Sequence, residues 1–244
     1  MHDFPAGRLA AWSTAWLTGR TSYDDALDAV TADTAHRVSG LPGTDGAVSL
    51  GEALAALRGL GERRLRLVLP APGDVRGLPA VPGLAALALE AGQAAVGDAV
   101  VLVPEPLGPE VLQWTAFGLD RVPLPPPVEG TLRAASGALD LAVSGSARTL
   151  AGLDLARWHP EVPELLAGLA RPTPAQGLPP DSDPLALSIL GRALRVAAVL
   201  DLAMADAPGG AVNQAQAARR DAVLRPLSAA VREAVTAAYN ALPR

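Results

Sequence analysis

The chain has 244 residues, of which 50% are hydrophobic, and a formal net charge of −5, so it can bury the core of one large or two small domains. It contains no cysteine and no lysine, and all 20 basic residues are arginine. These absences exclude disulfides, thiolate catalysis, Cys-ligated metals, lysine Schiff bases and the lysine-dependent phosphate loop, and the acidic balance argues against nucleic acid as a partner.

The first 60 residues are predicted to be mainly helical. Apolar residues at helical spacing predict one helix over residues 6–18, a second that begins after an N-cap at Ser22, and a third over residues 49–60. Between the second and third helices, His36 to Val38 are expected to form a short extended piece before a turn-rich segment.

The next 60 residues carry the strand signals. Leu65, Leu67 and Leu69 alternate with more polar positions, which is typical of a strand with one buried face. A helix is expected over residues 82–91. The dipeptide Gly97-Asp98 separates two apolar runs, 93–96 and 99–103, and so predicts a hairpin. A further strand is predicted over residues 111–117.

The second half of the chain is predicted to be helical. A proline-rich connector over residues 122–128 precedes expected helices over residues 131–157, 160–170, 185–205 and 211–242. The predicted fold class is therefore α+β, with a short antiparallel β-meander of three to four strands packed with N-terminal helices and a larger C-terminal helical region. Its two regions, 1–127 and 128–244, are expected to pack together as one compact unit.

Catalytic and cofactor motifs are missing from the sequence. There is no glycine-rich dinucleotide fingerprint and no Gly-x-Ser-x-Gly elbow, and only three histidines are present, which argues against a His-rich metal centre. His159 and Glu161 resemble part of the zinc-deaminase motif, but the cysteine ligands are absent and a turn before Pro160 explains the pair. No catalytic residue, cofactor or metal is predicted.

The loop from Pro70 to Pro79 is the best candidate for a ligand site. It follows a strand and carries Asp74 and Arg76 between glycines, so this pair could orient a small polar ligand, or it could brace its own loop. Glu105, after the predicted central strand, could lie near this loop. His36 could act as a general base or ligand contact, or it could be an ordinary core or turn histidine.

Arginine and tryptophan allow similar pairs of interpretations. Five arginines between residues 58 and 76 suggest an anionic ligand or acidic partner, although a solvated face explains them equally. Trp12 and Trp16, one helical turn apart, could stack on a base or sugar, but they fit a helix core better.

Four segments carry a resemblance to a known group of sequences. They are HRV (36–38), LRLVLPAPGDVRGLP (65–79), ALEAGQAAVGDAVVLVPE (88–105) and the pattern around APGGAVNQAQAARR near the C-terminus. Together they resemble conserved hypothetical proteins of high-GC actinobacteria, an uncharacterised family. This resemblance implies a similarity over most of the chain but no activity, and it assigns no catalytic residue.

Two hypotheses of function follow. The first is a non-enzymatic cytosolic protein that binds a protein partner or regulates one through its sheet face or helices, as a monomer or a homo-oligomer. The second is a small-molecule binding protein or an unrecognised enzyme that uses the Pro70 to Pro79 loop. No signal peptide is visible in MHDFPAGRLAAW, and the most apolar stretch, residues 185–205, carries three charges, so neither secretion nor a membrane is expected.

Overall fold

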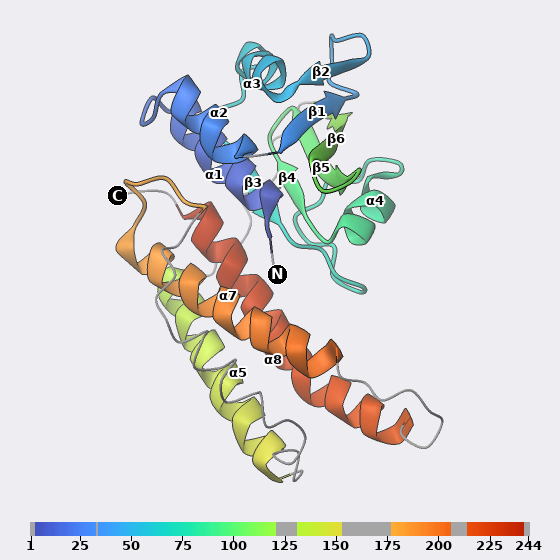
Figure 1. Ribbon diagram of the computed structural model, residues 1–244, viewed down its shortest axis with the longest axis vertical. Helices are drawn as coiled ribbons and strands as arrows, with labels where there is room; N and C mark the ends of the chain where they lie inside the picture. The colour runs from blue at the N-terminus through green and yellow to red at the C-terminus, as the bar shows by residue number, and fades with distance from the viewer. Residues whose placement is uncertain (1–2, 33, 121–130, 153–176, 206–213, 242–244) are drawn as a thin grey trace. The chain divides into compact units, whose positions relative to one another are not determined.

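The computed structural model describes residues 3–32, 34–120, 131–152, 177–205 and 214–241, which contain seven helices and six strands (Figure 1). The chain divides into two compact units. The sheet unit comprises Asp3–Glu129, Gly177–Ser182 and Leu242–Arg244, and the helical unit comprises Met1–His2, Gly130–Gln176 and Asp183–Ala241. The mutual packing of the two predicted regions stays a prediction. The predicted connector, the helix over 160–170 and His159 lie outside the described residues.

The sheet has six strands in the order β2-β1-β6-β5-β4-β3. Their bounds are β1 (Ala35–Ser39), β2 (Ala47–Ser49), β3 (Arg66–Val68), β4 (Ala94–Val96), β5 (Val100–Pro106) and β6 (Val111–Gly118). β1 pairs with β6 in parallel, whereas every other neighbouring pair is antiparallel. The unit is therefore α+β with a mixed sheet.

The α+β class is confirmed, but the prediction of three to four antiparallel strands is wrong. Strands β3 to β6 do form an antiparallel meander, and β5 lies between β4 and β6 as its doubly apolar sequence predicts. The meander is extended by β1, where the sequence predicts an extended piece over His36 to Val38 but no pairing with the meander, and by β2, whose three residues carry too little periodicity to be recognised. The parallel pairing of His36 with Leu112 joins residues distant in sequence, which no local pattern reveals.

Helices cover both faces of the sheet, although the sequence suggested one wet face. Helix α4 (Leu84–Ala91) packs on β4 and β5 through a cluster that comprises Leu84, Ala88, Ala94, Val96, Val101 and Val103. The alternate residues Ala95 and Leu102 are also fully buried and face the opposite side, where α1 (Pro5–Leu17) lies (Figure 1). Helices α2 (Tyr23–Thr31) and α3 (Leu50–Gly59) complete this side, with α3 against β1 and β2.

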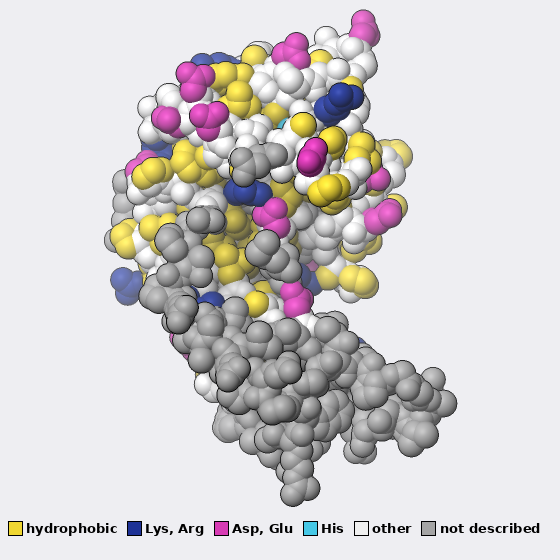
Figure 2. All heavy atoms as spheres, viewed as in Figure 1, with side chains coloured by type: hydrophobic (Ala, Val, Ile, Leu, Met, Phe, Trp, Pro, Cys, Tyr) yellow, Lys and Arg dark blue, Asp and Glu magenta, His cyan; other side chains and the backbone are white. Residues whose placement is uncertain are grey.

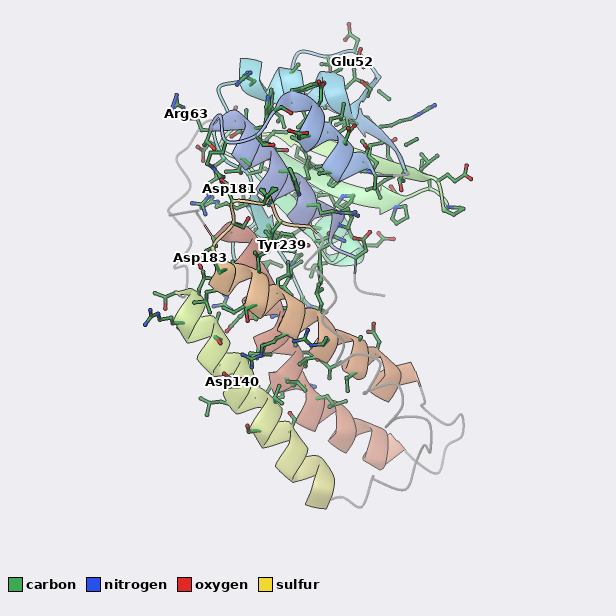
Figure 3. The ribbon with its side chains drawn as sticks, turned by 60° about the vertical axis from the view of Figure 1, so that its left-hand side comes forward. Glu52, Arg63, Asp140, Asp181, Asp183 and Tyr239 are labelled. Carbon is green, nitrogen blue, oxygen red and sulfur yellow. The ribbon has the colours of Figure 1, made fainter. Side chains whose placement is uncertain are left out.

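Two serine caps set where α2 and α3 begin. The hydroxyl of Ser22 accepts a hydrogen bond from the backbone N–H of Asp25 at 3.0 Å, which confirms the predicted N-cap. Ser49 and Glu52 form a reciprocal capping box at the start of α3, where Figure 3 labels Glu52. The hydrogen bonds from Ser49 lower the pKa of the Glu52 carboxyl.

The helical unit is built on three long helices: α5 (Leu132–Gly152), α7 (Pro184–Ala205) and α8 (Gln214–Asn240). Helix α8 packs against both α5 and α7, and its buried side chains include an alanine at every fourth position, Ala230, Ala234 and Ala238, together with larger residues such as Leu224 and Leu227. Arg192 of α7 donates to Asp140 of α5, which Figure 3 labels, and to the hydroxyl of Ser136. Within the described residues, no helix has both the length and the apolar composition needed to cross a membrane.

Candidate functional site

A buried histidine–tryptophan pair lies on the α1 side of the sheet. His36 in β1 is 9% exposed, and Trp114 in β6 is fully buried. The indole N–H of Trp114 donates to Nδ1 of His36 at 3.3 Å. Because Nδ1 accepts this bond, the neutral imidazole carries its proton on Nε2.

Two charged residues at the start of α1 act on this imidazole. Burial, and after it the positive charge of Arg8, lowers the pKa of His36 to about 4, while the Asp3 carboxylate acts in the opposite direction. His36 is therefore neutral at pH 7. Nη2 of Arg8 lies 3.0 Å from both carboxylate oxygens of Asp3. Nε of Arg8 is buried and, within the described part of the chain, has no hydrogen-bond partner.

Gln93 holds the chain in place at the start of α1. Its Oε1 accepts a hydrogen bond from the backbone N–H of Ala6 at 3.0 Å, and its Nε2 donates to the carbonyl oxygen of Asp3 at 3.4 Å. Phe4, the N-cap residue, makes no side-chain cap hydrogen bond. Gln93, which lies just before β4, thus supplies the acceptor for a free N–H group at the start of the helix. We call Asp3, Arg8, His36, Gln93 and Trp114 the α1 polar cluster. Its chemistry is that of hydrogen-bond donors around one arginine charge.

In the Pro70 to Pro79 loop, the structure brings Asp74 and Arg76 together. Oδ1 of Asp74 accepts from Nε of Arg76 at 2.8 Å and from its backbone N–H at 3.3 Å, and Oδ2 accepts from Nη2 at 3.0 Å. The backbone of Asp74 also pairs with Ala71 across a tight turn. Asp74 therefore braces its own loop, while the Arg76 side chain remains 82% exposed.

The four predicted site residues do not converge on one point. Glu105 pairs with Gln113, and Gln113 with Arg37, so these three residues share one face of the sheet. His36 is the neighbour of Arg37 on β1 and therefore points to the opposite face from Glu105. The loop that carries Asp74 and Arg76 follows β3, which β6, β5 and β4 separate from β1.

Glu62 is a buried carboxylate that the sequence analysis missed. It is 3% exposed and accepts backbone N–H bonds from Asp98 at 3.0 Å, Ala99 at 2.5 Å and Val100 at 3.2 Å, at the turn between β4 and β5. Burial raises the pKa of this carboxyl despite the three hydrogen bonds, and the Asp98 charge adds to the rise. A lone acid after a helix carries no sequence signal for a turn 36 residues away.

Arginines and tryptophans of the sheet unit serve the packing around α1. The guanidinium of Arg58 lies 4.5 Å from the ring centre of Trp16, and Trp16 meets Tyr23 edge to face at 5.5 Å. Trp16 is 6% exposed, which confirms its core position.

On the side shown in Figure 2, acidic and basic side chains alternate with apolar ones, and acidic residues gather over α2, where Asp24, Asp25 and Asp28 are exposed.

Family comparisons connect the whole chain to one group of sequences. Residues 6–130 match the model of the N-terminal domain of Rv1486c-like proteins, and residues 133–236 match that of the C-terminal domain. The chain belongs to the Rv1486c-like family. It is 34% identical to the uncharacterized protein Rv1486c of Mycobacterium tuberculosis over 282 aligned residues, which cover 98% of this chain and 96% of that protein.

Other mycobacterial relatives extend the family. The uncharacterized protein ML1804 of Mycobacterium leprae is 30% identical, and MAV321 of Mycobacterium avium is 29% identical, each over 98% of this chain and 97% of the relative. These matches confirm the resemblance to an uncharacterised actinobacterial family. No solved structure matches. Because the relatives are themselves uncharacterized, membership of the Rv1486c-like family brings no activity to the chain, and its function is unknown.

Proposed function

We propose that this Rv1486c-like chain is a non-enzymatic binding protein and that it engages a protein partner through the outer face of β1, β6 and the end of β5. We call this surface the open face. Its centre is a row of three residues in register across the strands: Arg37, Gln113 and Glu105. We place this activity in the cytosol, which suits a chain without cysteines.

The observation that carries the proposal is the contrast between the two faces of these strands. On β6, Leu112, Trp114 and Ala116 are buried, whereas the alternate residues Gln113 and Thr115 are half-buried. Helix α4 packs on β4 and β5, on the open-face side of the sheet, and its cluster extends to Phe117 near the end of β6, whereas Arg37, Gln113 and Glu105 are outside that cluster. A strip of sheet beside a helix is a surface that a partner segment can cover.

The charges on the open face support recognition of a partner. Arg37 and Glu105 are both exposed, and neither side chain makes an ion pair or hydrogen bond within the part of the chain that the structure describes. Gln113 is held in place by its hydrogen bonds to the hydroxyl of Ser39 and the carbonyl oxygen of Trp114. Charges of opposite sign, about two strand spacings or roughly 10 Å apart, give a surface that can orient a partner.

A charge swap tests the open face without changing the net charge. The double variant Arg37→Glu, Glu105→Arg should lose a specific partner that wild type retains from native cytosol. The matched control is Asp24→Arg, Arg63→Glu, which swaps two exposed charges outside the open face. A photo-crosslinking residue at position 37 should link to the same partner, and one at position 24 should not. Equal recovery by wild type and both double variants would refute the proposal.

A small anionic ligand at the Pro70 to Pro79 loop is the second candidate, with Asp74, Arg76 and Glu105 as its proposed contacts. The observation that favours it is the Arg76 guanidinium, which Asp74 holds in place although the side chain is 82% exposed. β3 and β5 run in the same direction, so Glu105 leaves the sheet at the same end as this loop. Because His36 faces the other side, Asp74 and Arg76 carry this proposal.

Mutations distinguish the two candidate functions. Arg76→Gln should abolish saturable binding of an anionic metabolite in a calorimetric screen and leave partner recovery unchanged. The single variant Arg37→Glu, which leaves Glu105 in place, should have the reverse effect. If Arg76→Gln alters no binding event that wild type shows, the second candidate fails.

A further inference from the structure

We propose that Arg8 and His36 form a binding site for the carboxylate group of a small molecule, and that Asp3 occupies Arg8 when this ligand is absent. The site lies on the α1 side of the sheet, whereas the open face lies on the other side. The proposal is therefore independent of the partner-binding function.

Arg8 supplies the charge and one unused donor. Its Nη2 lies 3.0 Å from both oxygens of Asp3, which already shows that a carboxylate fits against this guanidinium. Its Nε–H is buried and lacks an acceptor within the described residues. A buried donor without a partner destabilises the protein, so an added acceptor would be stabilised there.

His36 supplies a second donor with a fixed proton. Trp114 donates to its Nδ1, so the neutral ring carries hydrogen on Nε2, and no acceptor for that atom is present among the described residues. The charges of Arg8 and Asp3 both act on the pKa of the His36 imidazole, in opposite directions. A neutral donor beside a single arginine charge matches a monocarboxylate better than a doubly charged phosphate.

Asp3 has the properties of a displaceable occupant. Its side chain is 62% exposed, it lies before the first residue of α1, and Gln93 holds only its backbone carbonyl oxygen. Ion pairs of such exposure contribute little to stability, so an incoming carboxylate can replace this one at little cost. Movement of the Asp3 side chain would free Nη2 of the guanidinium for another carboxylate.

The test is a titration of the full chain with sodium acetate and, separately, sodium phosphate, at constant ionic strength. The indole N–H signal of Trp114 and the Nε–H signal of Arg8 are followed by NMR. Acetate should shift both signals saturably. Asp3→Asn should tighten acetate binding several-fold because the competing carboxylate is gone, and Arg8→Gln should abolish binding.

Matched controls come from a second ion pair of the same unit. Arg20 has the same 26% side-chain exposure as Arg8 and pairs with Asp181 at 2.7 Å, so Arg20→Gln and Asp181→Asn should leave the acetate affinity unchanged. If Arg8→Gln fails to fold, Arg8→Lys replaces it in the test. This variant keeps the charge but loses the paired N–H donors of the guanidinium, so it should bind acetate more weakly than wild type. No saturable shift in wild type and Asp3→Asn, no gain in Asp3→Asn, or tighter binding of phosphate than acetate would each overturn the proposal.

Discussion

The carboxylate of Glu62 lies so close to the backbone of Gly97 that no side chain fits between them. A Cβ atom at Gly97 would lie 2.6 Å from Cδ of Glu62, well inside contact distance. The same carboxylate accepts the backbone N–H groups of the three following residues, Asp98 to Val100. The β4–β5 hairpin is thus closed both by its own turn and by a side chain that follows α3.

Gly97→Ala should destabilise the protein by about 1–3 kcal/mol, because the added methyl group must displace Glu62 from its three hydrogen bonds. Urea unfolding followed by circular dichroism measures the loss. The control is Gly59→Ala at the end of α3, where nothing lies within 4 Å of the new Cβ. Gly59→Ala should be neutral or slightly stabilising, and an equal loss in both variants would contradict this explanation.

Glu62 should also give stability an unusual pH dependence. Its folded-state pKa is raised above the unfolded value of about 4.3. The stability linked to this group is therefore full below about pH 4.3 and is lost as the pH rises through the folded pKa. Glu62→Gln cannot titrate, so the stability difference between wild type and Glu62→Gln should shift against wild type as the pH rises. A difference that grows in favour of wild type would show that the hydrogen bonds outweigh burial.

Neighbouring residues of α1 should respond in opposite directions. Ser13 is fully buried, and its hydroxyl has no hydrogen-bond partner within the described residues, so Ser13→Ala should stabilise by about 1 kcal/mol. Thr14 donates to the carbonyl oxygen of Leu65 at 3.1 Å and accepts from its N–H at 3.0 Å. Thr14→Val should cost about 2 kcal/mol, and Thr14→Ser should keep most of that energy. Thermal unfolding of the three variants checks the order, and loss of stability in Ser13→Ala would contradict it.

His36 should titrate near pH 4, which NMR of its ring protons measures directly. Because its folded-state pKa of about 4 lies below the unfolded value of about 6.5, the stability linked to this group is full above pH 6.5 and is lost as the pH falls toward 4. His36→Gln should remove this acid-sensitive component, which is at most about 3 kcal/mol. Arg8→Gln should raise the midpoint and Asp3→Asn should lower it, because their charges act in opposite directions. A midpoint near 6.5 in wild type would mean that the ring is solvated.

Much of the local structure follows from short patterns in the sequence. Ser22 caps α2 because a serine hydroxyl beside free helix N–H groups satisfies them wherever the rest of the chain lies. Gly97-Asp98 lies at the β4–β5 turn, and the alternation along β6 correctly separates buried Trp114 from Gln113. Each of these signals spans fewer than ten residues, so it can be recognised in the sequence without knowledge of the fold.

The candidate site was harder to predict, because its residues are far apart in the sequence and no short pattern links them. The sequence left His36 with two interpretations, because Arg8 and Trp114, which act on it, lie 28 and 78 positions away along the chain. The pairing of Asp74 with Arg76 is local and was recognised as a candidate. The contact of Glu62 with the hairpin was missed, because a single acidic residue has no periodicity.

By itself, the sequence determined the α+β class, the positions of most helices and of the four meander strands, and the exclusion of cysteine and lysine chemistry. These features depend on composition and on hydrogen bonds or side-chain alternation within one element. Only the tertiary structure decided the parallel pairing of β1 with β6, the burial of His36 against Trp114, and the exposure of Arg37 and Glu105 on one face of the sheet. Those features depend on which distant segments meet, and burial energy, summed over the whole chain, makes that choice.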